Sequence, residues 1–151
     1  MKRCWIEYLL VAFMVACGSG PSQLFATTVS GALSYTYSAT SQVDANNNWP
    51  ACTATITTEC VTGFNVYDTT GSTPVLLGKV PNSQTPSGAQ TMTFTFTATG
   101  LAYGTNTAVE TTAYIGSGGT SAESADSAPA TFTVPAPGSP GPPAIISLTA
   151  K

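Results

Sequence analysis

Two short segments of the sequence combine residue types and spacings that could support chemistry, and the first is an acidic, Asn-rich stretch. Asp44, Asn46 and Asn48 place side-chain oxygens at alternate positions, as calcium-binding loops do. However, Trp49 stands where the sharp turn of such a loop requires Gly, and Thr55 stands where its bidentate Glu belongs. We therefore expect an ordinary Asn-rich turn and no metal site.

The second segment contains a pair of cysteines. Of the four cysteines, Cys4 and Cys17 lie within or at the end of an N-terminal apolar stretch, which leaves Cys52 and Cys60 as a pair in the body of the chain. Their spacing is not Cys-x-x-Cys, and no second cluster of Cys or His accompanies them, so zinc binding and thiol redox chemistry are disfavoured. We expect a disulfide, which would stabilise the fold by roughly 2 to 3 kcal/mol by closing a short loop.

The chain contains no histidine. It therefore lacks the commonest general base, the commonest metal ligand and the usual partner of a nucleophilic Ser or Cys. The carboxylates are scattered over different turns, which disfavours a glycosidase pair. The run from Gly116 to Gly119 is followed by no helix and no Lys, so we expect a hairpin turn and not a phosphate cradle. The sequence predicts no catalytic residue, no cofactor and no enzymatic activity.

Two aromatic residues are the candidate binding residues. Trp49 and Tyr114 could stack on sugar rings or dock a protein partner if their rings are exposed. The alternative is that Trp49 caps the open end of the fold. Both interpretations remain open at this point.

Charge limits the partners. Without residues 1 to 26, two lysines face six carboxylates, a net charge of −4. Binding to nucleic acid or to an anionic membrane requires clustered Lys and Arg, so both are disfavoured. Only 7 % of the residues are charged, against a typical ~25 %. We expect the partner to be a protein or a polysaccharide at the cell surface.

The first 26 residues predict export. Lys2 and Arg3 precede an apolar stretch from residue 8 to residue 16, which is shorter than the ~20 residues that span a bilayer. One alternative is cleavage between residues 16 and 20, or after Ala26, with release of a soluble product. The other is a lipobox at residues 14–17 that makes Cys17 the lipidated first residue of an envelope protein, such as an outer-membrane lipoprotein. In both cases the protein is extracellular or envelope-bound, and only in the second case does it contact a membrane, through the lipid on Cys17.

The elements that must position these residues are strands. A period of two in apolar residues, which is typical of a strand with one buried face, marks three segments. They are 29–39 with Val29, Leu33, Tyr35 and Tyr37, 91–99 with Met92, Phe94, Phe96 and Ala98, and 107–115 with Val109, Thr111, Ala113 and Ile115. Further strands are expected at 61–68, 74–80 and 130–134, and no stretch after residue 26 has a helical period. Short strands separated by Gly, Pro and Asn turns predict an all-β antiparallel sandwich or barrel.

Three motifs resemble a fibronectin type III domain over residues 29–134. Val61-x-Gly63-Phe64-Asn65-Val66-Tyr67 looks like the third strand of that family, Leu101-x-x-Gly104-Thr105 looks like its corner before the sixth strand, and Val109-x-Thr111-x-Ala113 looks like the inward face of that strand. The resemblance implies an immunoglobulin-like antiparallel β-sandwich. It also implies a non-enzymatic extracellular or envelope-anchored module for adhesion or protein interaction, with a carbohydrate-binding surface module as the alternative.

The expected organisation has three parts: a signal peptide and tether at 1–26, the sandwich at 27–134, and a Pro/Gly linker with an apolar tail at 135–151. No separate first strand precedes Val29. Three outcomes are open for the tail, which contains Ile145, Ile146 and Leu148. It covers the edge that the missing strand leaves, it adds to a sheet of a neighbouring subunit, or it frays.

Overall fold

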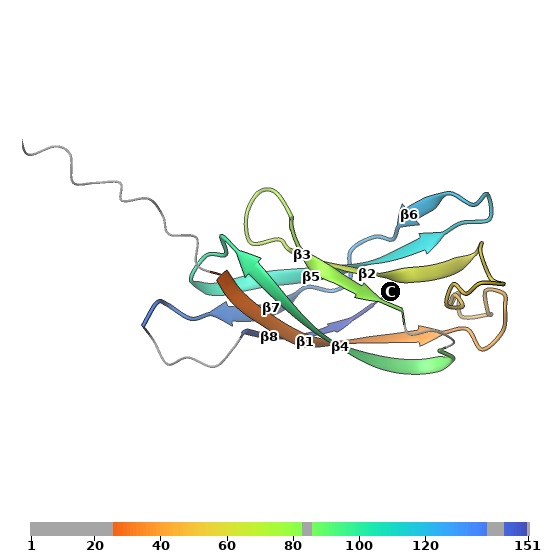
Figure 1. Ribbon diagram of the computed structural model, residues 1–151, viewed down its shortest axis with the longest axis horizontal. Helices are drawn as coiled ribbons and strands as arrows, with labels where there is room; N and C mark the ends of the chain where they lie inside the picture. The colour runs from red at the N-terminus through yellow and green to blue at the C-terminus, as the bar shows by residue number, and fades with distance from the viewer. Residues whose placement is uncertain (1–25, 83–85, 139–143, 151) are drawn as a thin grey trace, which may run out of the picture.

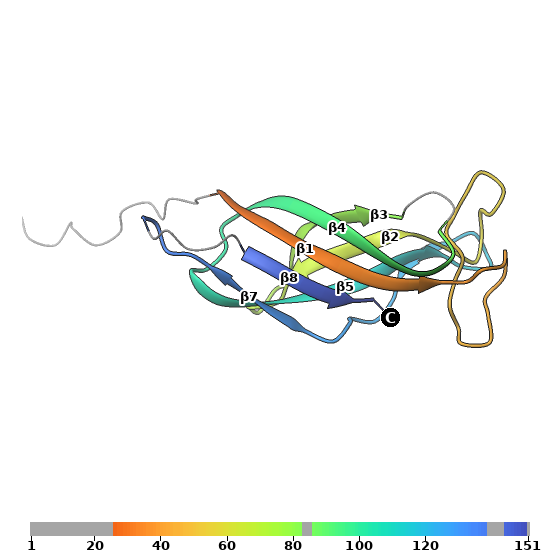
Figure 2. The same ribbon diagram turned by 90° about the horizontal axis from the view of Figure 1, so that it is seen from below.

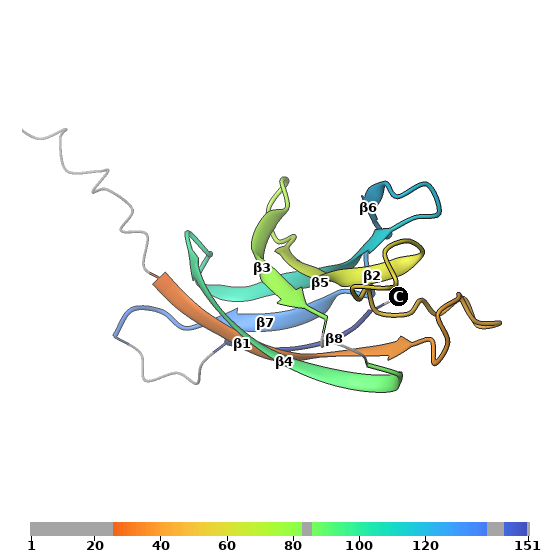
Figure 3. The ribbon, with the colours of Figure 1, turned by 45° about the vertical axis from the view of Figure 1, so that its right-hand side comes forward.

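Alternation of apolar and hydroxylated residues produces an all-β protein of two sheets. The computed structural model describes residues 26–82, 86–138 and 144–150, and these residues form eight strands. The predicted signal peptide, the lipobox at residues 14–17 and Cys17 lie outside the described residues. Figure 1 and Figure 3 show the two sheets as stacked layers, so the fold is sandwich-like.

Sheet A has three strands in the order β4-β1-β8. β1 (Ala26–Tyr37) and β4 (Gly88–Thr99) pair antiparallel over their whole lengths, from Ala26 opposite Thr99 to Tyr37 opposite Gly88. β8 (Ala144–Thr149) lies parallel to β1, with Val29 opposite Ala144. Figure 2 shows both strands running in the same direction. The prediction of a wholly antiparallel sandwich is therefore wrong for this pair, and sheet A is mixed.

Sheet B has five strands. Four follow the order β3-β2-β5-β6, and the fifth, β7, also pairs with β5. Their bounds are β2 (Cys60–Asp68), β3 (Val75–Pro81), β5 (Gly104–Ile115), β6 (Ser121–Glu123) and β7 (Ala130–Val134). The long β5 carries β7 along its first half and β6 along its second half. The three-residue strand β6 was not predicted from the sequence, because its residues Ser, Ala and Glu have no strand signal.

The core lies between the sheets and follows the predicted alternation of β1 and β4. Val29, Leu33 and Tyr37 of β1 are at most 1 % exposed. In β4, Phe94 and Ala98 are buried and Met92 and Phe96 pack against them, while every intervening Thr is exposed. Both faces of this strand pair are as the sequence predicts.

The predicted inward face of β5 is wrong by one residue. Ala108 belongs to the core cluster and Val109 does not, so the even-numbered residues of β5 point between the sheets. Those residues include Asn106, Glu110 and Thr112, which are polar. A period of two shows that two faces differ, but it does not show which face is buried. In β5 the apolar residues Val109, Ala113 and Ile115 lie on the outer face, so the sequence pattern predicted that face to be the buried one.

The C-terminal tail pairs within the chain. β8 occupies the β1 edge that no earlier strand covers, and Ala144, Ile146 and Leu148 are 1 to 3 % exposed. Of the outcomes open for the tail, the structure shows the one in which it covers this edge.

Candidate functional site

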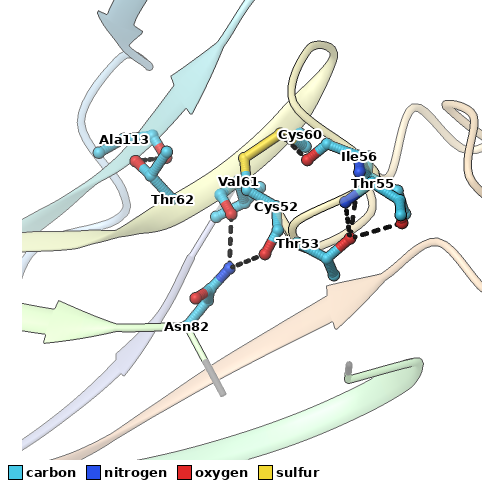
Figure 4. The surroundings of a disulfide bond; sticks show 9 residues. All are labelled: Cys52, Thr53, Thr55, Ile56, Cys60, Val61, Thr62, Asn82 and Ala113. Carbon is cyan, nitrogen blue, oxygen red and sulfur yellow. Dashed lines mark hydrogen bonds between the residues drawn. A yellow bond between two sulfur atoms is a disulfide. The ribbon is translucent and has the colours of Figure 1, made fainter. Parts of the chain in front are cut away.

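The disulfide loop is built at the end of the sandwich where β1 finishes and β2 begins. Cys52 and Cys60 are bonded with a Cα–Cα distance of 4.9 Å, which confirms the predicted pair. The Cys52 amide donates to the Val61 carbonyl at 2.9 Å. The Asn82 side-chain nitrogen Nδ2 donates to the same carbonyl at 2.7 Å, as Figure 4 shows. These bonds hold the loop against β2 and against the end of β3.

The loop brings the two predicted binding residues together. The Trp49 ring lies 5.2 Å from the Tyr114 ring, centroid to centroid, at a tilt of 42°. The backbone of Trp49 is held at the end of β1. Its carbonyl accepts from the amide of Ser38, the residue after β1, at 3.0 Å, and its amide donates to the Tyr35 hydroxyl at 3.4 Å. Trp49 is half-buried and packs against the core cluster. Its ring is therefore partly a cap of the sandwich, which was one of the two interpretations that the sequence left open.

The Asn-rich stretch closes on itself. Asp44 Oδ1 accepts from the amides of Asn46 and Asn48, each at 2.9 Å, and Oδ2 accepts from the Asn48 side chain at 3.0 Å. These hydrogen bonds hold the pKa of Asp44 below its ordinary value, and the bond from the Asn48 side chain contributes most. Both carboxylate oxygens thus serve the turn. Among the described residues no three His, Cys, Asp or Glu side chains gather closely enough to hold a metal ion.

A groove of about 670 Å³ runs along the outer face of sheet B, near the disulfide end. Asn65, Lys79, Ala113, Tyr114 and Glu123 are among its lining residues. Tyr114 borders the groove, while its ring packs on Trp49, so the groove adjoins the loop end at this residue.

Glu123 is the organised carboxylate of this groove. Its Oε2 accepts from the Thr111 hydroxyl at 2.6 Å and from the Tyr67 hydroxyl at 3.1 Å. These bonds join β6 to β5 and β2. The hydrogen bond of Thr111, more than any other contact, holds the pKa of Glu123 below its ordinary value, and Lys79 acts in the same direction. Glu123 is therefore ionised at neutral pH, and it faces the sole cation of the described residues, Lys79.

A second polar group lies between the sheets, where the sequence predicted apolar residues. Glu110 is fully buried, and its Oε1 accepts from the Thr112 hydroxyl at 3.0 Å while its Oε2 has no hydrogen-bond partner. Burial raises the pKa of Glu110 from 4.5 to about 7. The Asn106 side chain donates to the Ala102 carbonyl at 2.8 Å, and its own oxygen has no partner. To predict these buried polar groups from the sequence, one would have had to know which face of β5 points inward. The periodicity of β5 predicted the opposite face.

Buried Glu110 and the groove do not form one reactive centre. Glu110 points between the sheets, whereas Glu123 and Thr111 lie on the outer face of sheet B. A carboxyl group that solvent does not reach has no route to a substrate in this conformation. The surface that can meet a partner consists of the groove and the loop end.

The fold is that of an all-β, two-sheet protein with one disulfide bond among its described residues. Comparisons with protein-family models, with curated proteins and with solved structures gave no match. Within the described part of the chain no helix has the length and apolarity needed to cross a membrane. The disulfide is consistent with an oxidising extracellular or envelope environment.

Proposed function

We propose that the protein is a non-enzymatic extracellular or envelope-anchored β-sandwich module, similar to a fibronectin type III domain, that serves adhesion or protein interaction. The resemblance of residues 61–67 and 101–105 to that family supports the fold assignment. Two stacked sheets of short strands are compatible with it. The parallel β8 is a departure from an antiparallel sandwich.

The observation that carries the proposal is the position of the groove relative to the start of the chain. β1 begins at one end of the sandwich, and the loop of residues 38–59 lies at the opposite end, as Figure 1 shows. The groove and the Trp49–Tyr114 pair lie toward this second end. If the chain is attached through its N-terminal segment, with lipid on Cys17, this end points away from the envelope and meets a partner first.

The test is binding of the purified, processed protein to whole cells and to a panel of surface proteins by biolayer interferometry. Tyr114→Ala and Lys79→Gln should each weaken binding at least tenfold, because both residues line the groove. Val75→Ser is the matched control, since Val75 is 51 % exposed and does not line the groove. Equal loss in all three variants, or no loss in any, would contradict the proposal.

Carbohydrate binding is the second candidate, and a specific observation favours it. Tyr114 lines the groove together with Asn65, which carries an amide, and Glu123, which carries a carboxylate. An aromatic ring beside planar polar groups is a combination that recognises sugars. A glycan array with wild type, Tyr114→Ala and Trp49→Ala separates the two candidates. If a soluble oligosaccharide competes with binding to cells, the result supports a carbohydrate ligand. If it does not compete, the result supports a protein partner.

A further inference from the structure

The C-terminal strand β8 is joined to the rest of the molecule in an unusual way. It makes no strand pairing with β7, which precedes it in sequence, and its ladder partner is β1, from which most of the chain separates it. The pairing is parallel, and the Ala150 amide extends it by donating to the Ser34 carbonyl at 2.9 Å. No tight turn therefore commits β8 to the β1 of its own chain.

The β1 edge is shaped for this particular strand. Ala144, Ile146 and Leu148 point between the sheets and are almost fully buried, whereas Ile145 on the other face is 65 % exposed. Gly31 lies opposite Ile146, and a Cβ atom at Gly31 would collide with the Ile146 carbonyl and with the Phe94 ring. Because Gly31 has no side chain, the backbone of β8 can approach β1 at this position.

A strand held in this way satisfies the same contacts whether it comes from its own chain or from another copy. The hydrogen bonds to β1 and the three buried side chains belong to the strand and its seat, and nine residues of sequence separate Val134 from Ala144. A short tether gives an effective concentration on the order of millimolar. Copies that are crowded beyond that concentration gain by exchange, because no new interface has to be created.

We propose that two copies of this chain exchange β8 reciprocally, each copy seating its C-terminal strand, residues 144–149, beside β1 of the other. The partner is thus a second copy of the protein. The seat at Gly31, the parallel register and the burial of Ile146 and Leu148 specify the contact. Exchange would tie together neighbouring modules on one surface while the groove of each stays free, so this inference does not depend on the ligand of the groove.

The experiment uses two populations of the processed protein with tags of different size, and both carry Cys17→Ser. One carries Ser30→Cys and the other Ile145→Cys, because these residues are register partners in β1 and β8. Neither chain can form this cross-link within itself. The two are mixed at low and at millimolar concentration, warmed briefly toward the unfolding transition, cooled, and treated with a short bis-maleimide.

We expect a cross-linked heterodimer that increases at least tenfold at the higher concentration. Ser72→Cys in place of Ser30→Cys measures random collision, since Ser72 lies in the exposed turn between β2 and β3. Adding Ile146→Asp to the donor chain should abolish the cross-link, because that strand cannot enter the seat. A second readout, size-exclusion chromatography with light scattering, needs no substitution and should show a dimer after the same treatment.

A heterodimer yield equal to that of the Ser72→Cys control, together with a purely monomeric wild type, would overturn the proposal. A cross-link that persists with Ile146→Asp would overturn it as well, because contact would then not require the seat.

Discussion

The two sheets differ in where they keep polar chemistry. None of the three strands of sheet A contains a charged residue. Sheet B contains four, namely Asp68, Lys79, Glu110 and Glu123. The outer face of sheet A presents Thr and Ser, some of which pair across strands, as Ser30 and Thr95 do at 3.1 Å. The outer face of sheet B presents the groove.

This difference separates stability from recognition. Sheet A provides four aromatic rings to the core, Tyr35, Tyr37, Phe94 and Phe96, against two from sheet B, and it has an uncharged, solvated outer face. Sheet B carries ionisable groups on both faces: Glu123 and Lys79 face solvent, and Glu110 faces the core. We therefore expect substitutions in sheet A to act mainly through packing, and substitutions in sheet B to act through hydrogen bonds, charge and pH.

The largest effect should come from the seat of β8 in sheet A. Ile146→Ala should lower the free energy of unfolding by about 4 kcal/mol, because it removes a fully buried side chain and leaves a cavity. Ile145→Ala is the matched control, since the neighbouring isoleucine is 65 % exposed and should cost less than about 0.5 kcal/mol. Urea denaturation followed by fluorescence measures both. Equal effects would contradict the burial pattern of β8.

Glu110 should give sheet B a pH dependence that sheet A lacks. Its pKa is 4.5 when exposed and about 7 in the fold. Because the folded pKa is the higher one, the folded state binds the proton more tightly, and the stability that this provides is complete below pH 4.5 and is lost as the pH rises through 7. The loss should be about 3 kcal/mol.

The Glu110→Gln variant isolates this contribution, since the amide is close in shape to the neutral acid and does not ionise. Urea denaturation from pH 5 to pH 8.5 should show the wild type losing stability relative to the variant by about 2.5 kcal/mol, because a small part is already lost at pH 5. The difference between the two proteins cancels the titration of Asp44 and Glu123, whose pKa values are lowered. A difference that stays constant across this range would show that Glu110 is ionised in the fold.

The disulfide should have an intermediate effect, confined to the loop end that both sheets share. Replacing Cys52 and Cys60 by Ser together should lower the free energy of unfolding by about 2.5 kcal/mol, through the entropy of the unfolded chain. We also expect the Trp49 fluorescence maximum to shift to longer wavelength, because the loop that holds its ring over Tyr114 is released. An unchanged emission spectrum would mean that β1 alone positions Trp49.

The smallest effect on stability should come from replacing a Thr by Val on the outer face of each sheet. Thr111→Val in sheet B removes the hydrogen bond to Glu123 and should cost about 1 kcal/mol. Thr93→Val in sheet A changes an exposed side chain and should cost less than about 0.5 kcal/mol. Thermal unfolding by circular dichroism compares the two variants. A cost at Thr93 as large as that at Thr111 would remove the contrast between the sheets.

The candidate site was partly accessible from the sequence. The pairing of Cys52 with Cys60 follows from elimination among four cysteines, and Trp49 and Tyr114 stood out as aromatic residues near loops. The sequence did not reveal that these two rings touch, nor that Lys79 and Glu123 share a groove. Such contacts join residues far apart in the chain, and local pattern contains no information about which distant strands become neighbours.

By itself the sequence determined six of the eight strands, all except β6 and β8, because alternation of apolar and hydroxylated residues can bury one face only in an extended chain. That argument predicted the inward faces of β1 and β4 correctly. Only the tertiary structure decided which face of β5 meets the core and that β8 runs parallel beside β1. Both depend on the opposing sheet: the burial of Glu110 is tolerated once it binds a proton, and β8 is held by an edge that only the assembled sandwich provides.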